Sequence, residues 1–182
     1  LTLDAGPAGN VTLSGALSGG GDLTVTDGAV QAYGALTVNS IDIQDATTSV
    51  TLGGALASTT TIDINSGGSL VQNGAITSGT TVDLDAGSTL GLNASISGVS
   101  GTVDIDATGV TTVAAAGDIT SGGAVVFGAN KAGTLTTSGD VTTTDDDVTF
   151  TNAVTLGGSV SVDTGGVAAG NILFSSTVAT AG

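Results

Sequence analysis

The sequence predicts an all-β protein, a single-stranded parallel β-solenoid (β-helix) of about eight coils with roughly 20–24 residues per coil. The first observation is a repeated pattern: an apolar residue, Asp, an apolar residue, Asn or Asp, a small residue and then Gly, with at most one insertion. It occurs at residues 62–67, 82–87 and 103–109, and the copies start 20 and 21 residues apart. A fixed period of this size is typical of solenoids, in which each unit buries its apolar face against the next.

The second observation is a composition suited to short strands and tight corners. The chain has 31 Gly and abundant Thr, whereas Glu is absent and Lys and Arg together number one. Thr favours strands and Gly favours corners, while Glu, Lys and Arg are strong helix formers. We therefore expect no helix, and one continuous solenoid segment over residues 1–182.

The individual coils can be assigned in order from the N-terminus. Residues 1–6 are the pattern in its simplest form, and Gly19–Asp22 turns the chain into the second copy. The predicted coil starts are residues 1, 23, 41, 62, 82, 103, 125, 148 and 172. Each coil is expected to hold about three strands of three to five residues. Coils stacked about 4.8 Å apart would form a rod on the order of 40 Å long.

The C-terminal half carries a different pattern, an apolar residue followed by any residue and then Phe. It recurs at 125–127, 148–150 and 172–174 and contains every Phe of the chain. This pattern favours simple filling of the core in longer and wider coils; stacked in register, the three rings would form a ladder inside the rod. Residues 160–165 repeat the older pattern, so the register of this half stays open.

An antiparallel β-sandwich is the main structural alternative, because it also combines many short strands with Gly-rich turns. Sandwich strands usually run longer, and their turns do not recur at one interval. The return of the Asp-x-Gly corner at nearly constant spacing favours the solenoid.

The charge and the missing residue types exclude several classes of function. The chain has 16 Asp and one cation, Lys131, for a net charge of −15. This charge argues against binding nucleic acid or anionic lipid, both of which need basic residues. There is no Cys and no His, which excludes disulfides, thiol nucleophiles and the usual transition-metal sites. No apolar stretch approaches the roughly 20 residues of a membrane span.

The strongest candidate site is a row of carboxylates. The middle residue of each apolar-Asp-apolar triplet should point outward, because successive strand residues face opposite sides. At one coil per repeat these residues should stack roughly 5 Å apart, and a second polar row should follow two positions on, at residues 44, 65, 85 and 106. The row consists of Asp42, Asp63, Asp83 and Asp104. Such a row suggests divalent cation binding, most plausibly of Ca²⁺; the alternative is a solvated acidic face that keeps the rod soluble.

A second candidate is the densest negative patch, residues 142–147, which ends in Asp145, Asp146 and Asp147. It could hold a cation or be an exposed loop.

An enzyme is not expected. Paired carboxylates serve glycoside hydrolysis, but with one Lys, no Arg, no His and short corners no substrate groove is evident. The Thr residues that could form an ice-binding array do not recur at one coil position in the sequence, and β-propensity explains them.

The repeats resemble the β-helical shafts of filamentous-haemagglutinin-like and autotransporter-type surface proteins of Gram-negative bacteria. The residues that carry the likeness are 1–6, 79–87, 147–156, 160–165 and 170–174. The resemblance implies a secreted or surface-anchored rod, extracellular or on the cell surface, that serves adhesion, biofilm matrix or surface structure. A host or matrix glycan is a possible partner for the Asp row.

The sequence at the two ends of the chain predicts that other coils stack on the first and last coils. Leu1 enters directly into the repeat, and residues 178–182 stop in mid-pattern. Unpaired strand edges are normally covered. We therefore expect both end coils to be covered, either by further coils of a longer polypeptide or by identical copies stacked end to end.

Overall fold

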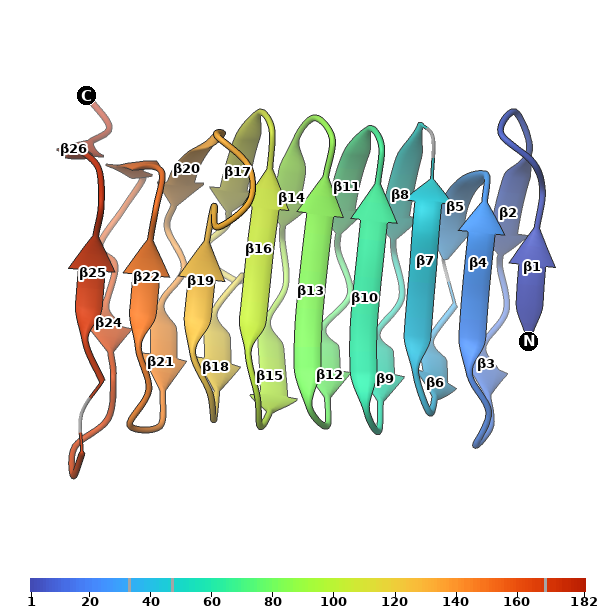
Figure 1. Ribbon diagram of the computed structural model, residues 1–182, viewed down its shortest axis with the longest axis horizontal. Coiled ribbons are helices and arrows are strands. Elements are labelled where there is room, and N and C mark those ends of the chain that lie inside the picture. Colours follow the sequence, from blue (N-terminus) through green and yellow to red (C-terminus); the bar gives the residue numbers. More distant parts are fainter. Residues whose placement is uncertain (33, 47, 169) are drawn as a thin grey trace.

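The computed structural model describes residues 1–32, 34–46, 48–168 and 170–182, and within these ranges the chain forms strands and no helix. Three parallel sheets wind into a β-solenoid of about eight turns, which confirms the predicted fold class (Figure 1). Sheet A is the row β1-β4-β7-β10-β13-β16-β19-β22-β25, sheet B is β2-β5-β8-β11-β14-β17-β20-β23-β26, and sheet C is β3-β6-β9-β12-β15-β18-β21-β24.

The strands are short, as expected for a solenoid with three walls. Sheet A consists of β1 (Thr2–Asp4), β4 (Leu23–Asp27), β7 (Ile41–Ala46), β10 (Thr61–Ser66), β13 (Thr81–Ala86), β16 (Val103–Ala107), β19 (Val125–Phe127), β22 (Val148–Phe150) and β25 (Ile172–Phe174). Sheet B consists of β2 (Asn10–Leu13), β5 (Ala29–Ala32), β8 (Ser49–Leu52), β11 (Ser69–Gln72), β14 (Leu90–Leu92), β17 (Val110–Val113), β20 (Thr134–Thr137), β23 (Ala153–Leu156) and β26 (Val178–Thr180). Sheet C consists of β3 (Leu17–Ser18), β6 (Leu36–Val38), β9 (Leu56–Ser58), β12 (Ile76–Ser78), β15 (Ile96–Val99), β18 (Ile119–Ser121), β21 (Val141–Thr143) and β24 (Val162–Asp163).

The predicted coil starts coincide with the strands of sheet A. Six of these strands begin at the predicted residue, while β1, β10 and β13 begin one residue away from it. The repeat therefore measures one full turn of the solenoid, and each copy of the pattern lies directly on the previous one. For example, Ile62 pairs with Ile41 on one side and with Val82 on the other.

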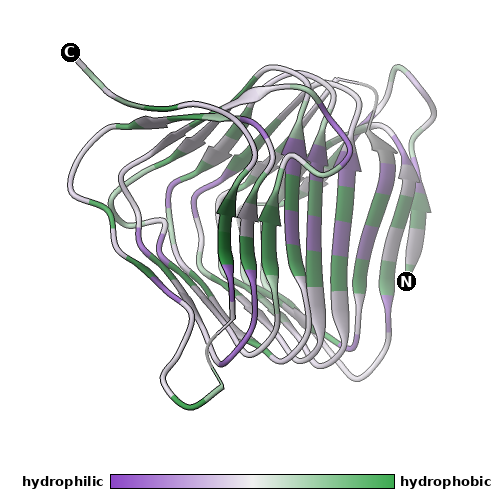
Figure 2. Cartoon of the chain, turned by 60° about the vertical axis from the view of Figure 1, so that its left-hand side comes forward, coloured by the Kyte–Doolittle hydropathy of each residue, from purple (hydrophilic) through white to green (hydrophobic). Residues whose placement is uncertain are grey.

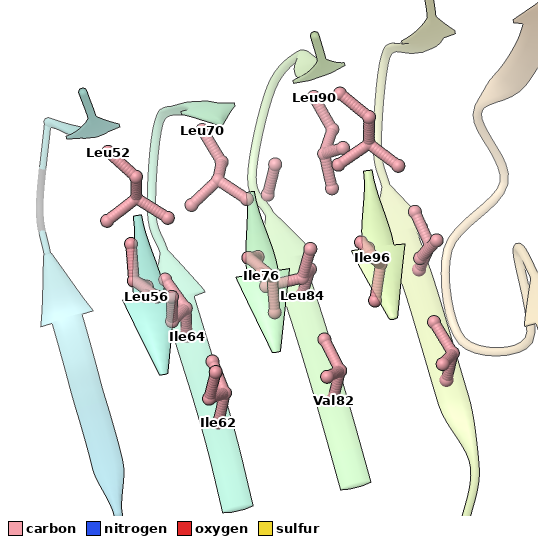
Figure 3. Packing of buried hydrophobic residues seen from close by; sticks show 14 of the residues in the cluster. Leu52, Leu56, Ile62, Ile64, Leu70, Ile76, Val82, Leu84, Leu90 and Ile96 are labelled. Carbon is pink, nitrogen blue, oxygen red and sulfur yellow. The ribbon is translucent and has the colours of Figure 1, made fainter. Parts of the chain in front are cut away.

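The core is a set of aliphatic columns that run along the rod. In β10, Ile62 and Ile64 are fully buried while Asp63 between them faces outward. The same alternation recurs in the neighbouring strands, so that sheet A carries apolar and polar bands across its strands (Figure 2). Leu70 of sheet B and Ile76 of sheet C close the core from the other walls (Figure 3). Each fully buried Leu or Ile contributes about 1.5–3 kcal/mol relative to exposure.

The structure settles the register of the C-terminal half. Val162 and Asp163 pair with β21 in sheet C, so residues 160–165 do not form a sheet A strand despite their repeat-like sequence. The physical reason is that the preceding strand, β23, pairs with β20 in sheet B, and the next apolar strand of the coil must then complete sheet C.

The three phenylalanines form a stacked ladder, the less favoured of the two interpretations of their pattern. Phe127 pairs with Phe150, and Phe150 pairs with Phe174, in adjacent strands of sheet A. The ring centroids are 5.2 and 4.5 Å apart, and both pairs are within 5° of parallel. Phe127 and Phe150 are buried, whereas Phe174 in the last coil is 39% exposed.

Buried Ser hydroxyls donate hydrogen bonds to backbone carbonyls at the corners between sheets C and A. Ser58 Oγ lies 2.8 Å from the carbonyl of Asn39 and 2.9 Å from that of Thr61. One coil later, Ser78 Oγ makes the equivalent contacts with the carbonyls of Thr60 and Thr81. A short hydroxyl at this place thus links one coil to the previous one without opening the core.

Within the ranges that the structure describes, no helix is long and apolar enough to cross a membrane.

Candidate functional site

The predicted carboxylate row exists. Asp42, Asp63, Asp83 and Asp104 occupy paired positions in β7, β10, β13 and β16, in unbroken register. Parallel pairing spaces such residues about 4.8 Å apart along the rod. Their neighbours in each strand are buried, so the carboxylates stand on the outer surface of sheet A. The polar bands in the middle of sheet A in Figure 2 belong to this surface.

The second polar row is confirmed for Asn65, Asp85 and Asp106, which pair in register. Gln44 is not aligned with them, because the pairing of β7 with β10 shifts by one residue after Ile64. A β-bulge of this kind inserts one residue on one strand and re-aims the neighbouring side chain. The Gln44 amide instead donates a hydrogen bond to Asp42 Oδ1 at 2.7 Å.

The two rows together bring four carboxylates onto two adjacent strands: Asp83 and Asp85 on β13, and Asp104 and Asp106 on β16. We call this group the Asp tetrad. The connection between β19 and β20, residues 128–133, lies against it. The backbone N–H of Asn130 donates to Asp106 Oδ2 at 2.9 Å, and Asp106 is only 1% exposed.

The single cation of the chain also belongs to this group. Lys131 Nζ lies 3.4 Å from Asp85 Oδ1, an ion pair without the geometry of a hydrogen bond. Asn152 in the following coil donates its side-chain N–H to the carbonyl of Lys131 at 2.9 Å and so holds this connection in place. The one Lys of the chain is therefore paired with one of the four carboxylates, that of Asp85.

The Asp tetrad is short of hydrogen-bond donors. Oδ1 atoms of Asp85, Asp104 and Asp106 are buried without a hydrogen-bond partner, and they are the only such side-chain atoms among the described residues. Burial of an unpaired carboxylate oxygen disfavours its charged form. Within the tetrad, this burial acts against the charged form of Asp104.

The pKa values follow from this arrangement. Loss of hydration, then the charges of Asp106 and Asp85, raise the pKa of Asp104 to about 6. The pKa of Asp83 is also raised to about 6, although its side chain is exposed. The first cause is partial loss of water around its carboxylate, and the second is the negative charge of the surrounding carboxylates, Asp85 before the others. Burial and the charge of Asp42 raise the pKa of Asp63. These carboxyl groups hold protons more tightly in the folded protein than in the unfolded chain.

The patch at residues 145–147 lies at a corner between sheets C and A, away from the carboxylate row. Asp145 has a positive φ of 61°, and its Oδ1 accepts the backbone N–H groups of Val167 and Ala168 at 3.3 and 3.2 Å. Asp147 Oδ1 accepts the backbone N–H of Asn171 at 2.6 Å. Two of the three carboxylates therefore accept hydrogen bonds from the backbone of the next coil, while the Asp146 side chain is exposed.

The same kind of contact gives a reason for Asp at two further corners. Asp118 Oδ1 accepts the backbone N–H of Asp140, and Asp140 Oδ1 accepts that of Ser161, at 2.9 and 2.7 Å. In each case the donor lies one coil further along the chain. A carboxylate on one methylene reaches a backbone N–H about one coil rise away, whereas Glu would overshoot.

In the described part of the chain, no three Asp side chains are arranged so that they could hold a metal ion. Ca²⁺ binding by the predicted ligands thus stays a prediction. The sequence signalled the tetrad only indirectly, through Asp at alternate positions of two consecutive copies. Nothing in it placed Lys131 beside Asp85, because that contact depends on the path of residues 128–133.

Replacing Lys131 by Gln should lower the free energy of unfolding by about 1 kcal/mol in dilute salt, because Asp85 loses its only counter-charge in a partly solvated ion pair. Urea titrations in about 0.05 M and about 1 M NaCl would measure it; the loss should shrink in high salt, where such pairs are screened. Lys131→Arg is the control and should keep most of the stability. A loss that is independent of salt would mean that Lys131 acts through packing alone.

No family model, no curated protein and no solved structure matches the chain.

Proposed function

We propose that this chain is a structural, non-catalytic segment of an extracellular or cell-surface rod in a Gram-negative bacterium: part of a surface fibre, an adhesin stalk or a biofilm-matrix filament. The observation that carries the proposal is the unbroken pairing of nine strands in sheet A and nine in sheet B, over one continuous core. Such a stack holds its two ends at a fixed distance from each other, because each coil packs directly on the next one.

The resemblance of the repeats to filamentous-haemagglutinin-like shafts supports the location. The end face formed by β25 and β26 supports the partners that the sequence suggests, further coils or identical copies stacked end to end. Ile172, Phe174 and Val178 are exposed there, although the residues that pair with them in the preceding coil, Val148, Phe150 and Val154, are buried. A further parallel strand would cover them and pair the open edge.

The composition supports the absence of catalysis. The chain has no His or Cys to act as acid, base or nucleophile, and its one Lys is already paired with Asp85. Incubation with acidic polysaccharides should release no product; cleavage would overturn this part of the proposal.

A distance measurement tests the rod itself, and the lack of Cys makes labelling simple. Spin labels at Thr24→Cys and Thr149→Cys would sit at the same height of sheet A, six strand pairings apart. We expect one narrow distance distribution near 29 Å, or six rises of about 4.8 Å. A broad distribution would contradict a rigid spacer.

The second candidate function is binding of Ca²⁺, or of a host or matrix glycan through Ca²⁺, on the outer surface of sheet A. The three buried Oδ1 atoms of the Asp tetrad that accept no hydrogen bond favour it. Millimolar Ca²⁺ should then raise the melting temperature, because a ligand that binds the folded state alone stabilises it. Asp83→Asn should reduce the rise and Asp146→Asn should not, while NaCl of equal ionic strength serves as the control. An unchanged melting temperature would exclude Ca²⁺ as a ligand.

A further inference from the structure

The strands of sheet A carry most of the Asp residues, and the other charges lie mainly at the corners, including Asp118 and Asp140 between sheets B and C. Sheet C contains a single Asp in its strands, Asp163, and the described strands of sheet B contain no charged residue. The remaining acidic residues outside sheet A lie at corners. Nine of the 16 Asp lie in strands of sheet A: Asp4, Asp27, Asp42, Asp45, Asp63, Asp83, Asp85, Asp104 and Asp106.

The outer surface of sheet B is built from small, uncharged side chains. Its middle column runs in unbroken register through Thr51, Val71, Gly91, Thr112, Thr136 and Thr155. These residues are exposed or half-buried, and their neighbours in each strand point into the core. A second outward column includes Val110, which is exposed, Thr134 and Ala153. β-branched and small residues on parallel strands make a surface with little relief.

We propose that this surface pairs with sheet B of a second copy of the chain, face to face, in a symmetric dimer. Each copy carries a net charge of −15, so contact through sheet A would bring carboxylates together, which is strongly unfavourable. Sheet B is the widest wall on which two copies can approach without that repulsion. Sheet C is narrower, with strands of two to four residues, and it carries Asp163.

The size of the surface fits a reversible dimer. Strands of about four residues at about 3.3 Å each, over eight coils at about 4.8 Å, give a wall of about 13 by 38 Å. Two such walls packed about 10 Å apart would bury on the order of 1,000 Å² in total, which is the lower end of specific interfaces. A symmetric contact uses the same patch on both copies and closes at two.

Sedimentation equilibrium of the 182-residue chain from about 1 µM to about 1 mM tests the proposal. The average mass should rise with concentration and level off at twice the monomer mass. Small-angle scattering of the dimer should show the length of one copy and a larger cross-section. Association should strengthen as NaCl is added, because salt screens the repulsion between two negative rods.

A pair of charge variants locates the interface. Thr112→Asp with Thr136→Asp places two charges on the outer surface of sheet B, and should weaken the dimer at least tenfold. Thr77→Asp with Thr120→Asp places the same charges on the outer surface of sheet C and should change the dissociation constant by less than about threefold. Circular dichroism and melting curves of both variants verify that each remains folded.

Three results would overturn the proposal. The first is a monomer over the whole concentration range. The second is a particle of doubled length and unchanged cross-section, which would instead be the end-to-end stacking of the proposed rod. The third is equal weakening by both variants, which would place the contact outside sheet B.

Discussion

Replacing Phe150 by Ala should lower the free energy of unfolding by about 3–5 kcal/mol, the usual cost of deleting a buried Phe side chain. Phe150 is 2% exposed and is the middle ring of the Phe ladder, with Phe127 at 5.2 Å and Phe174 at 4.5 Å. The substitution removes the transfer free energy of the ring, leaves a cavity in the core and takes a stacking partner from both neighbouring rings.

Phe174→Ala is the matched control, because this ring has the same chemistry, one stacking partner and 39% exposure. Urea titrations should show a loss smaller by about 2 kcal/mol than that of Phe150→Ala. Equal losses in the two variants would contradict the ladder as a packed core element.

The solenoid also predicts where the loss occurs. Stability in a stack of coils is a sum of nearest-neighbour contributions, so a local defect loosens the coils around it first. Hydrogen exchange in Phe150→Ala should accelerate in β19, β22 and β25, while β7 and β10 should keep the protection of the unsubstituted protein. Uniform acceleration along the rod would indicate a single all-or-none unit.

Asp104→Asn should raise the free energy of unfolding at pH 7 by about 1–2 kcal/mol, after allowance for solvent screening. The pKa of Asp104 is raised to about 6 from its ordinary 3.8. A raised pKa means that the contribution of this carboxyl group to stability is fully present below about pH 4 and is lost as the pH rises through 6. Asn has the same shape and carries no charge, so it removes the unfavourable contribution.

Melting curves from pH 4 to pH 8 measure this effect. The unsubstituted protein should melt at a higher temperature near pH 5 than at pH 7, and Asp104→Asn should raise the melting temperature at pH 7 by about 2–6 °C and reduce the slope. Asp146→Asn removes the same charge from an exposed side chain and should change the slope little. If the two variants behaved alike, the gain would come from net charge and not from the tetrad.

Much of the architecture could be predicted because the period of the sequence is the circumference of the rod. The triplets at 62–64, 82–84 and 103–105 carry both the inward apolar pair and the outward Asp, so their spacing specifies the coil length and the carboxylate row together. The Phe ladder was predictable for the same reason, because its three copies recur at one position of the coil.

Other features depend on contacts between coils that no local pattern encodes. Residues 160–165 resemble the repeat but complete sheet C, since a strand takes the wall that its predecessors in the coil leave open. Gln44 leaves its expected row because of one extra residue in β7.

The sequence by itself determined the solenoid, its coil length and the row Asp42, Asp63, Asp83 and Asp104, because period and alternation are properties of the chain alone. Only the tertiary structure decided that residues 128–133 lie against Asp106, that Lys131 pairs with Asp85, and that three carboxylate oxygens are buried without a hydrogen bond. The physical reason is that burial and charge pairing depend on which segments contact each other in space. At this corner the contact is made by residues 128–133, an irregular connection that does not follow the repeat.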